Sequence, residues 1–180
     1  MKTYVLTVSR TFPKTHKRAG EETYFVGRIL SELILSGIID RNVAERLKIN
    51  MDLFFPCNPK LHTIRANYVL WAKRMNEIQE GKAILSIRYW SGKPYNSKQV
   101  EICQLDKNSG CGLQELNFLD SRFDFPYVYC MHNPLTRVFK GLQRDLAKND
   151  GLSLDDFKDW FLKYDLSKPM AIIHFTKFRY

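Results

Sequence analysis

The spacing of hydrophobic and polar residues changes along the chain from the period of a strand to that of a helix. Residues 3–9 alternate weakly and are rich in Tyr, Val and Thr, which predicts an opening strand. Apolar residues over 22–34 follow helical spacing, and Gly37 supplies a stop. Asp40 can cap a shorter helix that ends near residue 47.

The middle of the chain predicts a third helix followed by a hairpin. Asn67 can cap a helix over 68–80, and Gly81 can end it. Two runs rich in β-branched and aromatic residues, 82–90 and 97–105, flank a short polar segment that contains Gly and Pro. Such a segment between two β-rich runs indicates a β-hairpin.

The last part of the chain predicts two helices and a closing strand. Residues 107–127 have mixed polarity and stay unassigned. The Asn-Pro pair at 133–134 is typical of a helix start, and an apolar stripe follows it to Leu146. Ser153 can open another helix in the manner of a capping box, and the run 170–178 predicts a final strand.

These expected elements define the fold class. Strands occur at both ends and in the middle of the chain, with helices between them. This order fits an α+β domain built around a small mixed sheet or barrel. We find no internal repeat and no low-complexity linker, so the sequence predicts one domain over 1–180.

The positive charge is concentrated in the first half of the chain. The formal net charge is +9. Residues 1–105 hold 17 basic and 9 acidic side chains, whereas residues 106–180 hold 11 and 10. Four cations near the N-terminus could contact a nucleic-acid backbone, or could simply keep a loop solvated: Arg10, Lys14, Lys17 and Arg18.

The sequence predicts no membrane span. The longest stretch without a charged side chain, residues 125–136, is shorter than the roughly 20 residues that a bilayer requires. The N-terminus has no apolar region of the length expected of a signal peptide. We therefore expect a cytoplasmic protein.

The four cysteines are expected to stay reduced. A zinc site could be formed by four candidate ligands: Cys103, Cys111, Cys130 and His132. The spacing between Cys103 and Cys111, however, is not one that is usual for zinc-binding cysteines. Buried or surface thiols are the preferred interpretation. No phosphate-loop, dinucleotide or zinc-protease motif is present, so we expect neither a metal nor a cofactor.

One motif resembles a known family. Residues 58–65 read Asn-Pro-Lys-Leu-His-Thr-Ile-Arg and reproduce the K-x-x-T-x-R core of the G-x-K-x-x-T-x-R signature of ASCH domains. A glycine followed by a strand at 81–88 and an acidic segment before a helix at 149–157 match further parts of that pattern. Asn58 stands where the signature has glycine, and Asp150 where some members carry glutamate.

The resemblance implies a fold and a first function. ASCH domains are PUA-like, so it implies a small mixed β-barrel with surrounding helices, in which residues 11–50 form a basic loop and a helical insertion after the first strand. It also implies that RNA or a modified nucleoside binds in a basic cleft. Lys60, Thr63, Arg65 and Asp150 would line that cleft.

The resemblance implies an alternative function as well. Small bacterial ASCH proteins act as amidohydrolases on N4-acetylcytidine, which would make Thr63 the nucleophile, Lys60 its base and Asp150 the acid. His62 or Arg65 could supply a field or hold an oxyanion. In a regular strand, however, Lys60 and Thr63 point to opposite faces, so their cooperation needs an irregular backbone.

Each of these residues also has a plain structural interpretation. Lys60 and Arg65 could contact phosphate or solvent. Thr63 could be an ordinary strand residue, and His62 an ordinary half-buried side chain. Asp150 could be a polar residue of a turn.

Aromatic residues near the signature could stack on a base. Most are expected in the core, whereas Trp90, at the end of a strand, is the best candidate for exposure. Arg88 would share its strand face and could contact a phosphate.

A third class of function, a protein-interaction module, requires that the helix face of Phe25, Ile29 and Leu33 is exposed. The oligomeric state cannot be predicted.

Overall fold

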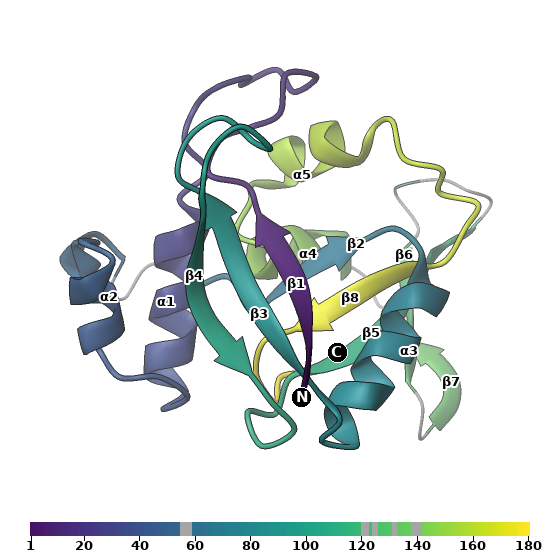
Figure 1. Cartoon of the computed structure of the whole chain (residues 1–180). Coiled ribbons are helices and arrows are strands. Elements are labelled where there is room, and N and C mark those ends of the chain that lie inside the picture. Colours follow the sequence, from purple (N-terminus) through teal and green to yellow (C-terminus); the bar gives the residue numbers. More distant parts are fainter. Residues whose placement is uncertain (55–58, 120–122, 124–125, 131–132, 138–141) are drawn as a thin grey trace.

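The computed structural model describes the chain except residues 55–58, 120–122, 124–125, 131–132 and 138–141. In the described part the chain forms two β-sheets and five α-helices, so the predicted α+β class is confirmed (Figure 1). None of the described helices combines the length and the hydropathy that a bilayer-spanning segment needs.

The smaller sheet has three strands in the order β1-β3-β4. They are β1 (Lys2–Val8), β3 (Ala83–Trp90) and β4 (Gln99–Leu105). β3 pairs in parallel with β1 and antiparallel with β4, and the β3–β4 register shifts between Ile87 and Arg88. The opening strand and the hairpin are therefore where the sequence predicts them.

The larger sheet has five strands in the order β2-β8-β5-β6-β7, and every neighbouring pair is antiparallel. It comprises β2 (His62–Arg65), β5 (Gly112–Phe118), β6 (Pro126–Cys130), β7 (Asn133–Arg137) and β8 (Met170–His174). Among the described residues the two sheets do not join into a closed ring, so the barrel part of the prediction remains a prediction.

One expectation for the last part of the chain is wrong in detail, and one unassigned stretch is now described. Residues 107–127, for which the sequence predicts no element, contain β5 and the start of β6. The Asn-Pro pair at 133–134 begins strand β7, not a helix. A proline lacks an N–H, and β7 is the outer strand of its sheet, where a missing donor is tolerated. The expected helix is observed as α4 (Leu142–Asn149), and residues 138–141 lie outside the described part.

The other predicted helices are observed close to their expected positions: α1 (Phe25–Leu35), α2 (Asn42–Arg46), α3 (Tyr68–Gln79) and α5 (Leu154–Phe161). A short 3-10 turn, Met51–Leu53, follows α2. The side chain of Asn67 accepts a hydrogen bond from the N–H of Leu70, and that of Ser153 from the N–H of Asp156. Both contacts satisfy N–H groups that would otherwise be unpaired at a helix start.

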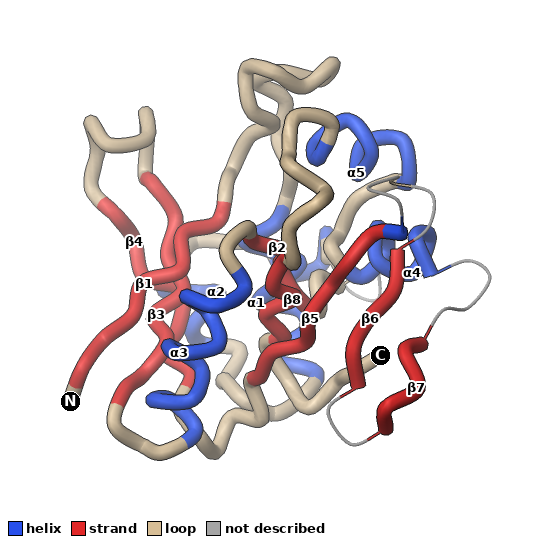
Figure 2. Tube along the Cα trace, turned by 90° about the vertical axis from the view of Figure 1, so that its right-hand side faces the viewer, coloured by secondary structure: helices blue, strands red, loops and turns tan. Residues whose placement is uncertain are grey.

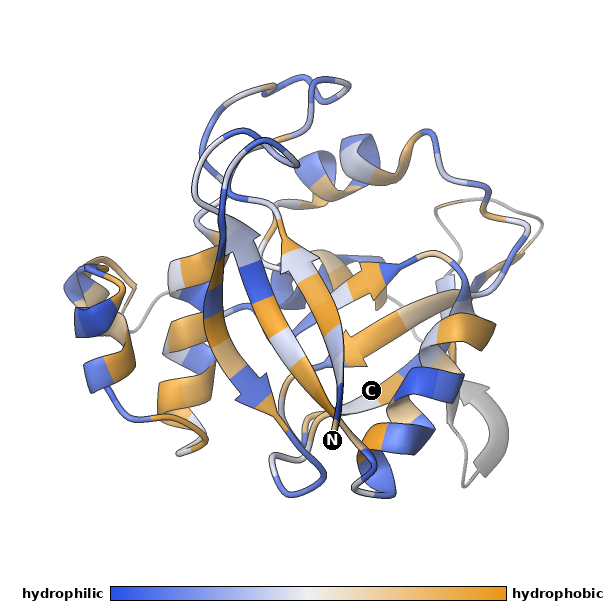
Figure 3. Cartoon of the chain, in the orientation of Figure 1, coloured by the Kyte–Doolittle hydropathy of each residue, from blue (hydrophilic) through white to orange (hydrophobic). Residues whose placement is uncertain are grey.

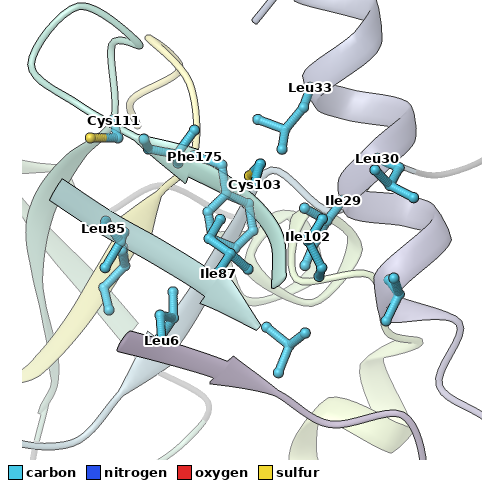
Figure 4. Close-up of a cluster of buried hydrophobic side chains, with 14 of the residues drawn as sticks. Leu6, Ile29, Leu30, Leu33, Leu85, Ile87, Ile102, Cys103, Cys111 and Phe175 are labelled. Atoms are coloured by element: carbon cyan, nitrogen blue, oxygen red, sulfur yellow. The ribbon is translucent and has the colours of Figure 1, made fainter. Parts of the chain in front are cut away.

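Strand β8 separates two hydrophobic cores, which explains why all five of its residues are buried. Ala171 and Ile173 face the first core, where the smaller sheet packs with α1 and α3. Figure 4 shows side chains of the smaller sheet, such as Leu85 and Ile87, in this core together with Ile29 of α1. Met170 and Ile172 face the second core, beneath α4 and α5. Because strand residues alternate between faces, a strand covered on both sides reads as a continuous apolar run.

Three segments that are far apart in the sequence gather at one end of the molecule. They are the loop from residue 9 to 24, the tip of the β3–β4 hairpin and helix α5, which all lie toward the same end in both views (Figures 1 and 2). The loop contacts α5, whereas the hairpin tip lies apart from α5 in Figure 2. This end is mostly hydrophilic at its loops (Figure 3). It frames the clefts described below.

Candidate functional site

The C-terminal turn of α4 determines where Asp150 lies. The N–H of Leu152 donates to the carbonyl of Ala147, and that of Gly151 to the carbonyl of Lys148. Gly151 has a φ of +76°. This pair of bonds around a left-handed glycine is a Schellman motif, with Asp150 as the C-cap residue. The motif ends the helix and turns the Asp150 side chain toward the segment before β2.

Lys60 and Asp150 form a buried ion pair. The Lys60 ammonium donates to Oδ1 of Asp150 at 2.5 Å and to the Asp150 carbonyl at 2.6 Å. Lys60 has 0% and Asp150 4% of its surface exposed. The Phe25 ring covers the ammonium at 4.0 Å from its centroid, and Nδ1 of His62 lies 3.6 Å from Oδ1 of Asp150. The structure therefore brings three predicted site residues together, but buries them.

Burial and neighbouring charges shift the pKa values in this cluster. Burial lowers the pKa of Lys60 to about 8. The negative charge of Asp150 raises this pKa in part, whereas the positive charges of Arg65 and Arg28 lower it further. Burial alone would raise the pKa of Asp150, but the charge of Lys60 and the contacts with His62 and Lys60 hold it below its ordinary value. The pair is stable as an ion pair at neutral pH because each charge compensates the other.

The cluster continues through His62 to the C-terminal segment. Nε2 of His62 shares a hydrogen bond of 2.7 Å with the Tyr180 hydroxyl, which also accepts from the side chain of Asn149. His174 lies opposite His62 in the β2–β8 register, with ring centroids 5.6 Å apart. In the part of the chain that the structure describes, neither ring nitrogen of His174 has a hydrogen-bond partner. Burial lowers the pKa of both histidines.

Thr63 and Arg65 lie on the other face of β2. Thr63 pairs with Ile173, which faces the first core, whereas Ile64 pairs with Ile172, which faces the second. The hydroxyl of Thr63 accepts from Nη1 of Arg65 at 2.7 Å. Nη2 of Arg65 donates to the carbonyl of Thr7 on β1. The alternation that sequence periodicity predicts therefore holds, and the hydrogen bonds of the Lys60 ammonium go to Asp150.

An open cleft lies beside Trp90 at this end of the molecule. It has a volume of about 590 Å³, and we call it the Trp90 cleft. Its walls come from the end of β1, the following loop, and the β3–β4 hairpin: Thr7, Val8, Ser9, Arg10, Thr11, Trp90, Gly92, Lys93, Pro94, Tyr95 and Gln99. The rings of Trp90 and Tyr95 lie 5.3 Å apart, and Tyr95 is 87% exposed. Trp90 itself is half-buried, so the exposed ring of this cleft is Tyr95, which sequence reasoning did not single out.

The predicted cations are used differently from one another. Arg10 lines the Trp90 cleft and donates to the carbonyl of Ser91. Arg18 binds Asp156 and Glu21, and Lys17 lies 3.7 Å from Asp156, so these two hold their loop against α5. Lys14 is exposed.

Arg88 does not line the Trp90 cleft. It donates to Ser86 and to Glu101 on the neighbouring strand. The predicted phosphate contact beside Trp90 is therefore replaced by an ion pair within the sheet, and Lys93 and Arg10 are the cations of the cleft.

The structure also bears on the zinc site and on the interaction module that the sequence allows. Cys103 and Cys111 are buried thiols, and burial raises the pKa of Cys103 to about 12. His132 lies outside the described residues, and within them no three metal-ligating side chains gather. The helix face of Phe25, Ile29 and Leu33 is buried, so the exposed face that an interaction module requires is not observed.

Sequence reasoning missed His174, Tyr180 and Arg28, whose guanidinium donates to the carbonyl of Gly151. Histidines are rare in this chain, and His174 ends an otherwise apolar strand, which is a signal that could have identified it. No local pattern indicates that Arg28, from a helix, meets the turn after α4.

Comparison with known proteins finds no matching family model, no matching curated protein and no matching solved structure.

Proposed function

We propose that the protein binds RNA or a modified nucleoside, with a base stacked in the Trp90 cleft. The observation that supports this is the pair of rings, Trp90 and Tyr95, in an open cleft that also holds Arg10 and Lys93. Every base has a flat face that can stack on an aromatic ring, and cations beside it meet the phosphates. The ASCH and PUA-like resemblance, with its barrel, belongs to the same proposal.

Thr63 and Arg65 support this cleft from behind. Arg65 connects Thr63 to the carbonyl of Thr7, and Thr7 forms part of the cleft wall. The Thr7 hydroxyl accepts from Gln99 across the sheet. In this proposal Thr63 and Arg65 position the cleft wall, while Lys60 and Asp150 stabilise the fold beneath it.

The test is binding of a fluorescently labelled oligouridylate, followed by anisotropy at several salt concentrations. We expect affinity to fall steadily as salt rises. The Tyr95→Asn variant should bind about 5- to 150-fold more weakly, the range that corresponds to losing one stacked base. Asparagine tolerates the positive φ of +65° at this position, so the change removes the ring without new strain.

Tyr164→Asn is the matched control, because Tyr164 is a partly exposed tyrosine outside the cleft. Its affinity should equal that of the unchanged protein. Equal affinities for the Tyr95→Asn variant and the control, or binding that ignores salt, would contradict the proposal.

An amidohydrolase is the second candidate, and the lowered pKa of Lys60 favours it. A lysine with a pKa of about 8 is partly deprotonated at neutral pH and can accept the proton of a hydroxyl. Thr63 would attack the amide carbonyl and pass its proton to Lys60, cytidine would leave with that proton relayed through Asp150, and water would release acetate from the threonine ester. This reaction requires that the buried Lys60 leaves Asp150 and reaches the opposite face of β2.

Incubation with N4-acetylcytidine tests this candidate. Release of cytidine and acetate that is lost in both Thr63→Val and Lys60→Met would support it. Release that survives Thr63→Val would exclude the assigned nucleophile, and no release would exclude the activity on this substrate.

A further inference from the structure

Three cavities adjoin one another at the hydrophilic end of the molecule. Beside the Trp90 cleft lies a cavity of about 370 Å³, which we call the Phe54 cavity, and beyond it one of about 320 Å³, the Gly151 cavity. Arg10 lines both the Trp90 cleft and the Phe54 cavity. Glu22 and Tyr24 line both the Phe54 cavity and the Gly151 cavity. The shared walls place the three cavities next to one another along the loop from residue 9 to 24, and we refer to this series as the path.

This loop is held in place by its own contacts. Thr11 and Glu22 form a β-bridge across it. His16 is buried and lies 3.0 Å from the carbonyl of Asp156, and the N–H of Lys17 donates to Asp159. The loop is thus fastened to α5, and the cavities along it are preformed, which reduces the ordering cost of binding.

Unusual backbone geometry is concentrated along this path. Among the described residues four non-glycine residues have positive φ: Tyr24, Lys48, Asn67 and Tyr95. Asn67 caps α3, whereas the other three line the cavities. A tyrosine or lysine in this conformation is strained, and such strain gathers where a side chain must be presented to a ligand. Tyr24 and Tyr95 are also exposed aromatic rings, at 52% and 87%.

Charge along the path is mostly positive. Lys93 and Arg10 line the first cavity, Lys48 the second, and Arg28 and Lys148 the third, together with Arg18. Two acids share the walls: Glu22 lies 3.6 Å from Arg10, and Asp156 accepts from Arg18. The acids are therefore compensated within the loop, and Lys93, Lys48 and Lys148 remain to attract a polyanion.

We propose that the three cavities form one groove that binds a single strand of nucleic acid of at least three nucleotides. One base stacks on Trp90 and Tyr95, a second on Tyr24, and the lysines meet the phosphates between and beyond them. Aromatic rings separated by cations are the arrangement that binds single strands with little sequence preference. This inference rests on the proposed function, because the Trp90 cleft is its first position.

The length of the ligand tests the groove separately from the cleft. Uridylates of two, four and eight nucleotides, and thymidylates of the same lengths, are titrated by anisotropy. We expect the octamer to bind at least tenfold more tightly than the dimer. Tyr24→Asn should weaken the octamer about 5- to 150-fold and leave the dimer unchanged, because only the longer strand reaches Tyr24.

Lys148→Glu should weaken the octamer alone and reduce its salt dependence. Arg144→Glu, an equal change of charge on an exposed position of the same helix that does not line the cavity, is the matched control. Circular dichroism checks that all variants are folded. Tighter uridylate binding assigns the groove to RNA, and equal binding assigns it to single strands of either sugar.

Two outcomes would overturn the inference. Equal affinity for dimer and octamer, with the loss in Tyr95→Asn retained, would leave the proposed function intact and restrict the site to the Trp90 cleft. Absence of any binding that depends on Tyr95 would remove the proposed function and the groove together.

Discussion

The ammonium nitrogen of Lys60 lies 2.5 Å from Oδ1 of Asp150, a residue 90 positions further along the chain. Lys60 comes from the segment before β2, and Asp150 from the C-cap of α4, so this contact fastens the central sheet to the helices that cover its second core. Both side chains are buried. An ion pair without water depends on both partners at once.

Removal of either partner should therefore destabilise the fold strongly. We expect Lys60→Met and Asp150→Asn each to lower the free energy of unfolding by about 3–5 kcal/mol, because each leaves an uncompensated buried group. The double variant should lose clearly less free energy of unfolding than the sum of the losses in the two single variants. Urea denaturation of all four proteins measures this coupling. Strictly additive losses would show that the two residues stabilise the fold independently.

Stability should also depend on pH in the alkaline range. Between pH 8 and 10.5 Lys60 loses its proton in the folded protein before it does so in the unfolded chain, because its folded pKa is lowered to about 8. The unfolded state then holds more protons, so the Lys60 contribution to stability rises with pH across this window.

The double variant Lys60→Met/Asp150→Asn isolates this effect. Other groups, such as Cys103 with its raised pKa, titrate alike in both proteins and cancel in the difference. We expect the stability of the unchanged protein relative to the double variant to rise from pH 8 to 10.5. A flat difference would mean that the folded pKa of Lys60 is close to its unfolded value.

Local patterns predicted most elements of this fold. The caps at Asn67 and Ser153 and the β-branched and aromatic runs of β3 and β4 depend on neighbours in sequence, and the structure has them where expected. The Asn-Pro pair at 133–134 misled the prediction, because the same dipeptide suits a helix start and an edge strand. What distinguishes the two is the pairing of this segment with β6, which the pattern of residues 133–137 alone does not reveal.

The candidate site was less predictable for the same reason. The motif identified Lys60 and Thr63, and periodicity correctly predicted that their side chains point to opposite sides, Lys60 to Asp150 and Thr63 to Arg65. That Lys60 binds Asp150 depends on the Schellman turn of a helix whose start the sequence did not reveal. The Trp90 cleft depends on a loop fastened to α5 by Lys17 and Arg18, which is again a tertiary contact.

The thiol of Cys103 should be unreactive in the folded protein. It is 7% exposed, and burial raises its pKa to about 12, so the nucleophilic thiolate is scarce at pH 8. Mass spectrometry after treatment with iodoacetamide should find Cys103 modified only when the protein is denatured. A chelator should not change this protection; protection that disappears with the chelator would indicate a zinc site instead.

Replacement of His174 by phenylalanine should make the protein more tolerant of mild acid. His174 is buried without a hydrogen-bond partner for either ring nitrogen among the described residues, so an apolar ring of similar shape should be neutral or stabilising at pH 8. The groups that face it are His62 opposite in the sheet, Tyr180, and the charge of Arg179. Its cationic form has no compensating acid among these neighbours.

The sign of the pH effect follows from the lowered pKa of His174. Below pH 6.5 the unfolded chain binds a proton at this residue while the folded protein does not, so stability falls as pH falls. Thermal unfolding between pH 8 and 4.5 should show a smaller loss in His174→Phe than in the unchanged protein. The remaining loss should come partly from His62, whose pKa burial also lowers. Identical pH profiles would mean that His174 binds its proton as readily in the folded protein as in the unfolded chain. That result would contradict its assignment as a neutral core residue.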